Sequence, residues 1–506
     1  MSAFIMTIYY GEYGYDYIQA ITIAIELYTS DVESRVSDAF IYRHENLKYA
    51  VERQLFTQYC NDESLIEFYN HLRRGGMSSQ YMCKDYFQNV LARNLVKSLG
   101  SEIDNAEIII QYNPCFICDV IRKIRHSVLG IIKGFLHRNK RSGIRNKKSI
   151  EGMYFVIHEK FINFFYSLYG ENDDNAYLTL DKSVGAHLSD RGLNGDYLRV
   201  SGFLCEKRPL KSELRKFPYL ISAFDSLYDF FEKVSVSYVV VPEGDASIYE
   251  VLNRVCKKAG VPTACIQQGW SPVTFSGTKN MSFDKMFVWG RGFFNMLSPL
   301  NPEQVFSISG NHIISNGGSE ASHHVDGKDG VCFLLQLNGA LISDNAWNNF
   351  VSLIRWTAIE FPETPVYIRE HPSFGLSEKD KESFNSIHNI IFASPRDYSL
   401  SDLFDRCFLS VAIYSSTILE SIEAGVLPII FNENSLPRYY PDVGAAGAGI
   451  EINNIDAAKN EISGILQNKM ILNSYLPAMS EFSNEYFNSN NSTDAKNIIL
   501  HELSEL

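Results

Sequence analysis

The chain has 506 residues, of which 45% are hydrophobic and 21% charged, and its formal net charge is −13. This length exceeds what one hydrophobic core usually supports, so we expect two domains, and the composition excludes a disordered or fibrous protein. The negative charge argues against a general nucleic-acid-binding protein, because affinity for phosphate depends on clustered Lys and Arg. We therefore expect no nucleic-acid partner.

The cysteines and the hydropathy bear on localisation. The nine cysteines are scattered without repeated spacing, which favours a reducing compartment over a disulfide framework. Cys115 and Cys118 form one CxxC without a second pair or a nearby His, so no metal or redox site is expected there. Residues 1–11 do not resemble a signal peptide, and no segment reaches the roughly 18 apolar residues of a spanning helix. We expect a cytoplasmic protein with at most peripheral membrane contact.

The first hundred residues are predicted to be mainly helical, followed by a candidate strand at 108–110. From Arg122 to Lys148 there are ten Lys or Arg residues and no Asp or Glu. Apolar residues recur at helical spacing within this basic segment, a pattern typical of an amphipathic helix at a membrane surface. Two interpretations stay open: docking on anionic lipid at the inner face of the plasma membrane, or a solvated basic loop or groove for an acidic polysaccharide.

From about residue 154 the pattern changes to strands alternating with helices. A β-branched run at 238–241, a helix over 247–259 and a strand at 262–266 form a predicted βαβ unit. Two more short strands are predicted at 284–289 and 305–308. These elements favour a sheet in the amino-terminal half.

Segment 315–330 is rich in Gly, Ser, His and Asp, a composition typical of a linker. We therefore place an amino-terminal acceptor-binding domain at 1–318 and a carboxy-terminal nucleotide-donor domain at 327–506. Helices from about residue 477 onward are expected to pack outside the second domain or to cross back to the first.

Strands and helices alternate clearly in the second half, which predicts a parallel sheet with helices on both faces. The predicted strands are 331–335, 365–369, 390–393, 408–413 and 427–431, and the predicted helices are 347–360, 400–405, 417–424 and 457–467.

A polar cluster follows each of four of these strands. Ligands bind at the carboxyl ends of strands in open parallel sheets, so the four clusters are expected to share one rim. The residues of the clusters are Gln336 to Gly339, including Asn338; Arg369 to Pro372; Ser394 to Asp397; and Ser415 to Thr417.

The run Ser415, Ser416 and Thr417 opens a predicted helix, where hydroxyls, backbone N–H groups and the helix dipole favour a phosphate. Simple N-capping explains the run equally well. Glu420, one turn into the helix, is placed to accept hydrogen bonds from ribose hydroxyls, or else is a solvated helix carboxylate. His371, before Pro372, is a candidate donor to the nucleotide phosphate or the departing oxygen, with Arg369 adding charge.

These strand-end residues resemble those of bacterial surface-polysaccharide glycosyltransferases, including capsule Kdo transferases, sialyl- and polysialyltransferases, and more loosely CDP-glycerol polymer transferases. The resemblance spans 331–431 and, in part, 238–311. It implies an α/β fold of the GT-B type, with two Rossmann-like domains facing a cleft and, in this chain, extra helices in the amino-terminal domain. It also implies that His371, Ser415 and Ser416 contact a nucleotide-sugar donor, with a CMP-Kdo or CMP-sialic acid donor favoured and a UDP-sugar possible.

The amino-terminal half departs from that pattern. The sialyltransferases carry two acids before a Gly, whereas this chain has Pro242-Glu243-Gly244-Asp245. Inverting transfer needs a carboxylate that takes the acceptor proton, so Glu243 is preferred as the base and Asp245 is the alternative, with helix capping as a competing role for Asp245. Many relatives have Gln-His-Gly after the next strand, and this chain has Gln267-Gln268-Gly269, which we assign to the acceptor side.

No DxD pair lies where a metal-dependent transferase would have one, so we expect neither a metal ion nor another cofactor. The predicted function is transfer of a sugar to a growing capsule or lipopolysaccharide glycan, or to a lipid-linked acceptor. Three alternatives remain: a CDP-alditol phosphotransferase, a nucleotide-sugar 2-epimerase, and a non-catalytic scaffold of a polysaccharide assembly complex.

Overall fold

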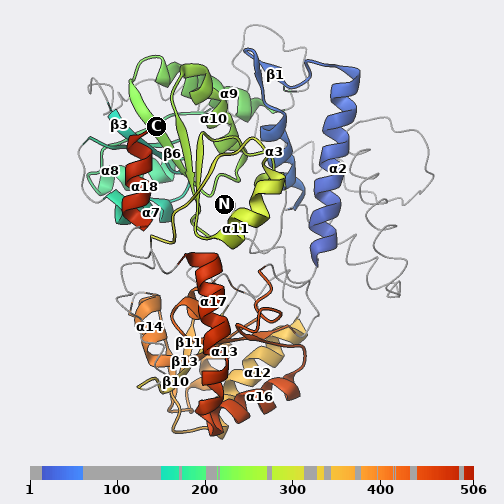
Figure 1. Cartoon of the computed structure of the whole chain (residues 1–506), viewed down its shortest axis with the longest axis vertical. Helices are drawn as coiled ribbons and strands as arrows, with labels where there is room; N and C mark the ends of the chain where they lie inside the picture. Colours follow the sequence, from blue (N-terminus) through green and yellow to red (C-terminus); the bar gives the residue numbers. More distant parts are fainter. Residues whose placement is uncertain are drawn as a thin grey trace, which may run out of the picture.

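A computed structural model gives the fold of the chain. It describes residues 14–60, 150–169, 174–200, 214, 217–269, 276–312, 327–335, 344–370, 376, 378–395, 397–413, 415, 417–432, 441–488 and 495–506. These residues form two parallel sheets flanked by helices, one above the other in Figure 1, and a small antiparallel ribbon near the amino terminus.

The first sheet has seven parallel strands in the order β5-β4-β3-β6-β7-β8-β9. The strands are β3 (Ile150–Phe155), β4 (Ala176–Thr179), β5 (Gly195–Tyr197), β6 (Val236–Pro242), β7 (Thr263–Ile266), β8 (Lys285–Val288) and β9 (Phe306–Ile308). Strands β3, β4 and β5 follow one another toward one edge of the sheet. The chain then crosses back to β6, which pairs with the other side of β3. The adjacent strands β3 and β6 therefore flank the topological switch point, where open α/β sheets bind their ligands.

Helices connect these strands: α7 (Lys160–Tyr169), α8 (Lys182–Asp190), α9 (Pro218–Phe231), α10 (Ser247–Ala259) and α11 (Arg291–Leu297). Helix α10 illustrates why the sequence folds this way. Its buried Ile248, Val251, Leu252 and Val255 recur at the spacing of one helical face. The helix ends at Gly260, whose φ of 70° is the left-handed conformation that glycine tolerates.

The second sheet has six parallel strands in the order β12-β11-β10-β13-β14-β15. The strands are β10 (Gly330–Leu334), β11 (Val366–Arg369), β12 (Ile390–Phe392), β13 (Cys407–Ala412), β14 (Leu427–Phe431) and β15 (Ile450–Ile452). The helices are α12 (Asp344–Glu360), α13 (Glu378–Phe384), α14 (Leu400–Arg406), α15 (Thr417–Glu423) and α16 (Ile455–Gln467). The strand order repeats that of the first sheet, so its switch point lies between β10 and β13.

The last helices return to the first domain. Helix α17 (Leu476–Phe487) packs against α15 of the second domain and α11 of the first, and α18 (Ala495–Ser504) lies on the first sheet. Ile499 and Leu503 of α18 share a buried cluster with Val240 of β6. The ammonium of Lys285 lies 3.0 Å from a carboxylate oxygen of Glu502.

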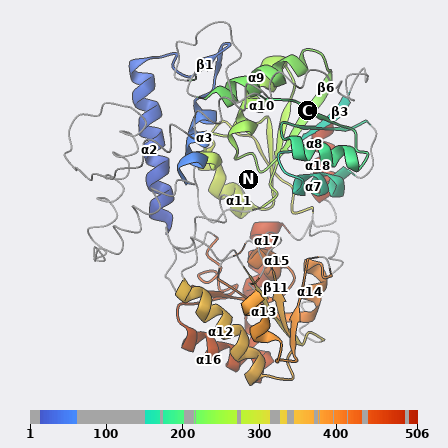
Figure 2. The ribbon, with the colours of Figure 1, turned by 180° about the vertical axis from the view of Figure 1, so that it is seen from behind.

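An added helical layer covers one flank of the first domain. It consists of α2 (Gly14–Arg35), the ribbon of β1 (Ile41–Tyr42) and β2 (Glu45–Asn46), and α3 (Lys48–Cys60). Figures 1 and 2 both show α3 between α2 and the rest of the domain. Helix α3 packs against α10.

The predicted fold class, with two Rossmann-like sheets and extra amino-terminal helices, is confirmed. The predicted strands of the second half agree with β10 to β14 to within one residue at each end, but the sequence did not reveal β15 or α13. The candidate strand at 108–110, the basic segment and most of 315–330 lie outside the described residues. None of the helices described is long and apolar enough to cross a bilayer.

Candidate functional site

Both switch points carry polar residues at the carboxyl ends of their strands. In the first sheet, Lys160 begins the helix after β3 and Glu243 follows β6 directly. In the second sheet, Ser415 and Thr417 follow β13, across from the end of β10. The topology therefore gathers the candidate residues at the two places where this kind of sheet binds ligands.

The chain turns sharply after β6. Glu243 and Gly244 both have left-handed backbone conformations, with φ of 61° and 74°. The Gly244 N–H donates to the Pro242 carbonyl (2.7 Å), and the Glu243 N–H donates to the Ile266 carbonyl (2.9 Å). A Cβ on residue 244 would lie 2.7 Å from Cys265 Sγ, so glycine is required there. The left-handed conformation costs a non-glycine residue roughly 1 kcal/mol, so the surroundings must hold Glu243 in place.

The carboxylate of Glu243 is largely enclosed, with 11% of the side chain exposed. Its Oε1 lies 3.9 Å from the ammonium of Lys160, and its buried Oε2 has no hydrogen-bond partner among the described residues. Burial raises the pKa of Glu243 to about 7; Lys160 opposes this shift and Asp245 adds to it. Such a pKa suits a group that exchanges protons near neutral pH.

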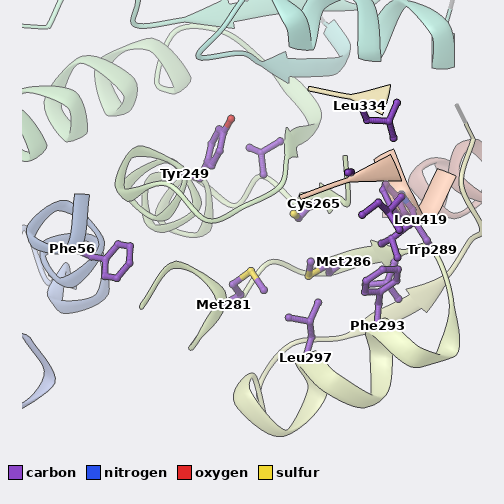
Figure 3. Packing of buried hydrophobic residues seen from close by; sticks show 14 of the residues in the cluster. Phe56, Tyr249, Cys265, Met281, Met286, Trp289, Phe293, Leu297, Leu334 and Leu419 are labelled. Atoms are coloured by element: carbon purple, nitrogen blue, oxygen red, sulfur yellow. The ribbon is translucent and has the colours of Figure 1, made fainter. Parts of the chain in front are cut away.

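Apolar and weakly polar side chains surround the turn, which explains the raised pKa. A Cβ at Gly244 would meet the side chains of Cys265, Met281 and Phe283. Figure 3 shows Cys265 and Met281 in the buried cluster that also contains Tyr249. Burial raises the pKa values of Tyr249 and Cys265, and the carboxylates of Glu243 and Asp245 add to both shifts.

Asp245 lies between this turn and α10. The N-cap position of α10 is held by Ala246, which makes no side-chain cap, so Asp245 does not occupy the capping position. The roles of Glu243 and Asp245 in catalysis remain proposals.

Three titratable residues on the same edge were not singled out from the sequence: His158, Lys160 and Asp181. His158 follows β3, and its Nδ1 accepts from the Lys160 N–H (3.1 Å). Desolvation lowers the pKa of His158 and the Lys160 charge adds to this, while Asp181 opposes it. Asp181 follows β4 and caps α8 by accepting from the Ser183 N–H (2.7 Å). The available signal was the sequence His-Glu-Lys directly after an apolar run, but β3 itself had not been delimited.

Gln267 joins the ends of β7 and β8. Its Oε1 accepts from the Trp289 backbone N–H (2.9 Å), and its carbonyl accepts from the Trp289 indole N–H (2.9 Å). Gln267 is buried, whereas Gln268 is half-buried at the same edge. A Cβ on Gly269 would lie 3.3 Å from Glu243 Oε1, so this glycine leaves room for the carboxylate. Gln267 is thus engaged within the protein, and the assignment of Gln267 and Gln268 to the acceptor side stays a prediction.

Arg369, at the end of β11, binds backbone carbonyls. Its Nη1 donates to the carbonyls of Ala393 (3.2 Å) and Tyr398 (2.7 Å). Burial lowers the pKa of Arg369, and the nearby Glu420 opposes that shift. The guanidinium therefore holds the loop after β12 through two hydrogen bonds, and it also lies near Glu420 of α15.

Helix α15 carries two enclosed carboxylates. Burial raises the pKa of Glu420 to about 7 against the influence of Arg369, and raises that of Glu423 to about 7 with a contribution from Glu420. Oε2 of Glu423 is buried and has no hydrogen-bond partner among the described residues. Glu420 is partly buried, and its contact with a ribose stays a prediction.

Ser415 has the role of a helix cap. Its hydroxyl accepts from the Thr417 N–H (3.2 Å), and its carbonyl accepts from the Ile418 N–H (3.1 Å). Helix α15 itself has only seven residues. A phosphate seat at Ser415 and Thr417 remains a proposal. Gln336, Asn338, His371, Pro372 and Ser416 lie outside the described residues.

Aromatic rings join the two domains at the end of β8. Trp289 stacks on Phe487 (centroids 5.6 Å apart), and Phe293 meets Tyr486 edge-on (5.4 Å). A Cβ on Gly292 would overlap the Tyr486 ring. Leu334 at the end of β10 and Leu419 of α15 belong to the same buried cluster (Figure 3). The carboxyl edges of both sheets are therefore turned toward the domain contact, and a cleft between the domains stays a prediction.

Within the described ranges, no group of three or more His, Cys, Asp or Glu side chains is arranged to hold a metal ion. Cys115 and Cys118 lie outside those ranges.

Comparisons with known proteins give similarity in structure alone. No protein-family model matches the chain, and no curated protein matches it in sequence. A UDP-GlcNAc 2-epimerase from Neisseria meningitidis, solved with UDP-GlcNAc, has 14% identity and a TM-score of 0.45, covering 71% of this chain and 100% of its own. The glycotransferase of kitacinnamycin has 11% identity and a TM-score of 0.47, covering 71% and 100%. The wall teichoic acid polymerase TagF has 12% identity and a TM-score of 0.46, covering 77% and 98%.

Proposed function

We propose that the chain is a GT-B glycosyltransferase that moves a sugar from a nucleotide-sugar donor to a hydroxyl of a growing capsule or lipopolysaccharide glycan. The observation that carries the proposal is the pair of switch points. One presents an enclosed carboxylate, Glu243, and the other presents Ser415, Thr417 and Glu420. Both sheet edges face the domain contact, so a donor on one domain and an acceptor on the other would meet there.

In this proposal Glu243 is the general base of an inverting transfer. Its carboxylate takes the proton of the acceptor hydroxyl while the acceptor oxygen bonds to the anomeric carbon. The bond from that carbon to the phosphate oxygen breaks, and the nucleotide leaves with the electron pair. A pKa of about 7 gives Glu243 enough basicity for this transfer near neutral pH, and Lys160, 3.9 Å away, favours the ionised form.

The second domain is proposed to bind the nucleotide. Glu420 accepts from ribose hydroxyls, and Ser415 and Thr417 approach the phosphate. On grounds of resemblance, Gln336, His371, Pro372 and Ser416 belong to the donor site, and a CMP-sugar is favoured over a UDP-sugar. Asn338 and Arg369 are added because they lie at strand ends of the same sheet. Because Arg369, His371 and the helix terminus supply positive charge, the reaction is proposed to need no metal ion.

The acceptor is proposed to approach Gln268, beside Glu243. The basic segment from Arg122 to Lys148 is proposed to hold the enzyme at an anionic membrane where lipid-linked acceptors reside. Flotation with liposomes tests the attachment. The protein should float with vesicles that contain anionic lipid and remain at the bottom of the gradient with neutral vesicles. Equal flotation with both kinds of vesicle would exclude the proposed attachment.

Thermal shift with CMP, CDP, UDP and GDP, followed by product mass, tests the function. A ligand that binds only the folded state raises the melting temperature as its concentration rises. The matching nucleotide-sugar and a glycan acceptor should then give a product heavier by one sugar. A polyol phosphate added to the acceptor would instead indicate the phosphotransferase, and an isomerised donor the 2-epimerase. No shift with any nucleotide would favour the scaffold.

The base assignment has its own test. Glu243→Gln and Asp245→Asn are compared with Glu159→Gln, whose side chain is 62% exposed. Loss of a general base slows turnover by about 10²–10⁴-fold, so Glu243→Gln should lose turnover on that scale and retain nucleotide binding. Full activity in both Glu243→Gln and Asp245→Asn excludes the assignment.

A further inference from the structure

Arg53 is a buried cation outside both sheets. It lies on α3, and only 1% of its side chain is exposed. Its Nη1 donates to the carbonyl of Gly244 and to Glu250 Oε2, and its Nη2 donates to the carbonyl of Lys279, each at 3.3 Å. One guanidinium therefore connects the added helical layer, α10, the segment after η3 (Ser276–Thr278) and the turn that carries Glu243.

Both terminal nitrogens of Arg53 are paired, whereas its buried Nε has no hydrogen-bond partner among the described residues. Glu250 is fully buried, and its other oxygen accepts from Arg254 Nε (2.8 Å). A buried Arg is tolerated when it is both charge-paired and hydrogen-bonded. A second ion pair links the helical layer to the segment after η3: the ammonium of Lys279 lies 2.9 Å from a carboxylate oxygen of Glu26 on α2.

The hydrogen bond from Arg53 to the Gly244 carbonyl restrains a stretch of backbone in an unfavourable conformation. Glu243 and Gly244 are both left-handed, which disfavours the conformation at Glu243. A donor fixed on the Gly244 carbonyl sets the orientation of the peptide that joins Gly244 to Asp245. That peptide and the Gly244 N–H bond to Pro242 together fix the direction in which the carboxylates on either side project.

We propose that Arg53 is a positioning residue, which holds the turn after β6 so that Glu243 points toward the acceptor hydroxyl. This inference rests on the proposed role of Glu243 as base. The planar fork of Arg can donate to separated acceptors at once, whereas the single ammonium nitrogen of Lys cannot span the same positions.

Arg53→Lys is the test variant and Arg254→Lys the matched control. Both alter a cation bound to Glu250, but only Arg53 contacts the turn. In the full-length protein, Arg53→Lys should speed deuterium exchange of the Glu243 and Gly244 amides. It should also lower kcat by about tenfold or more, since small misplacements of reacting groups have large effects on rate. KM for the donor should stay within about twofold, and the acid limb of the pH–rate profile should move to lower pH as water reaches Glu243. Arg254→Lys should leave all four measurements near wild type.

A second variant covers the case in which Arg53→Lys does not fold. Arg53→Gln/Glu250→Gln removes both members of the buried pair, and it also removes the guanidinium from Gly244. Arg254 loses its contact with Glu250 in this variant, but its side chain is 20% exposed, so water can solvate its charge. The double variant should show the same faster exchange and lower kcat. Wild-type exchange and kcat in a folded Arg53 variant would overturn the inference. If the wild type transfers no sugar from any donor, the proposed function fails, and exchange at Gly244 alone still decides whether Arg53 holds the turn.

Discussion

Replacing Glu243 with Gln should stabilise the protein at high pH and leave its stability unchanged at low pH. The pKa of Glu243 is about 7 in the folded protein, against an ordinary value of 4.5. Each unit of difference corresponds to roughly 1.4 kcal/mol, so ionised Glu243 lowers the free energy of unfolding by about 3 kcal/mol. Because the folded pKa is raised, the protein is most stable below pH 4.5 with respect to this group, and it loses that stability as the pH rises through 7.

Urea unfolding followed by tryptophan fluorescence measures the effect, because Trp289 is buried in the affected domain. At about pH 4 wild type and Glu243→Gln should have similar unfolding free energies, and at about pH 8.5 the variant should be more stable by about 3 kcal/mol. Glu159→Gln, whose carboxylate is exposed, should change neither value.

A difference between wild type and Glu243→Gln that does not depend on pH would refute the described burial of this carboxylate. A stability gain at high pH together with lost turnover would identify Glu243 as a group kept at the expense of stability. The stability measurement needs no donor or acceptor, so it is informative before the substrate is known.

Three further predictions concern the domain contact and the donor side. Gly292→Ala should destabilise the protein by about 1–3 kcal/mol in urea unfolding because its methyl group overlaps Tyr486. Gly464→Ala, in an open position within α16, should instead be neutral or stabilising by up to about 1 kcal/mol, and equal effects of the two substitutions would contradict the close packing at Gly292. Glu420→Gln should weaken calorimetric binding of the preferred nucleotide by about tenfold, and unchanged affinity would remove the ribose contact. Excess EDTA should leave turnover unchanged, whereas loss of turnover that Mg²⁺ restores would show that a metal ion is needed.

The regular parts of the fold could be predicted from the sequence. The limits of α10 and β14 agree with 247–259 and 427–431, because an amphipathic helix ending at Gly260 and a fully apolar strand are both local signals. The strand β15 was missed because it has only three residues, apolar, charged and apolar in turn, at the end of a glycine-rich stretch. Strands β4 and β5 were not delimited either, since four and three residues give little periodicity.

The environment of the candidate site depends on contacts that no local pattern reveals. Arg53 reaches Gly244 across 191 positions of sequence. Glu420 was expected to be either a ribose ligand or a solvated carboxylate, and its enclosure beside Arg369 results from the packing of β11 against the rest of the sheet. The positions of Glu243 and Ser415 at strand ends were predictable, whereas the left-handed backbone of Glu243 arises from the tertiary structure.

The return of α18 to the first sheet has a consequence for synthesis on the ribosome. Ile499 and Leu503 cover apolar side chains of the first sheet, including Val240 and Phe287. Translation proceeds at about 5–20 residues per second, so this face of the nascent amino-terminal domain stays uncovered for on the order of ten seconds or more after β9 is made. During that interval the second domain must be synthesised while the first exposes an incomplete core, which is a surface that chaperones recognise. Cutting the chain between the two sheets would leave the amino-terminal fragment permanently in that state, and α18 supplied as a separate peptide is the piece that would complete it.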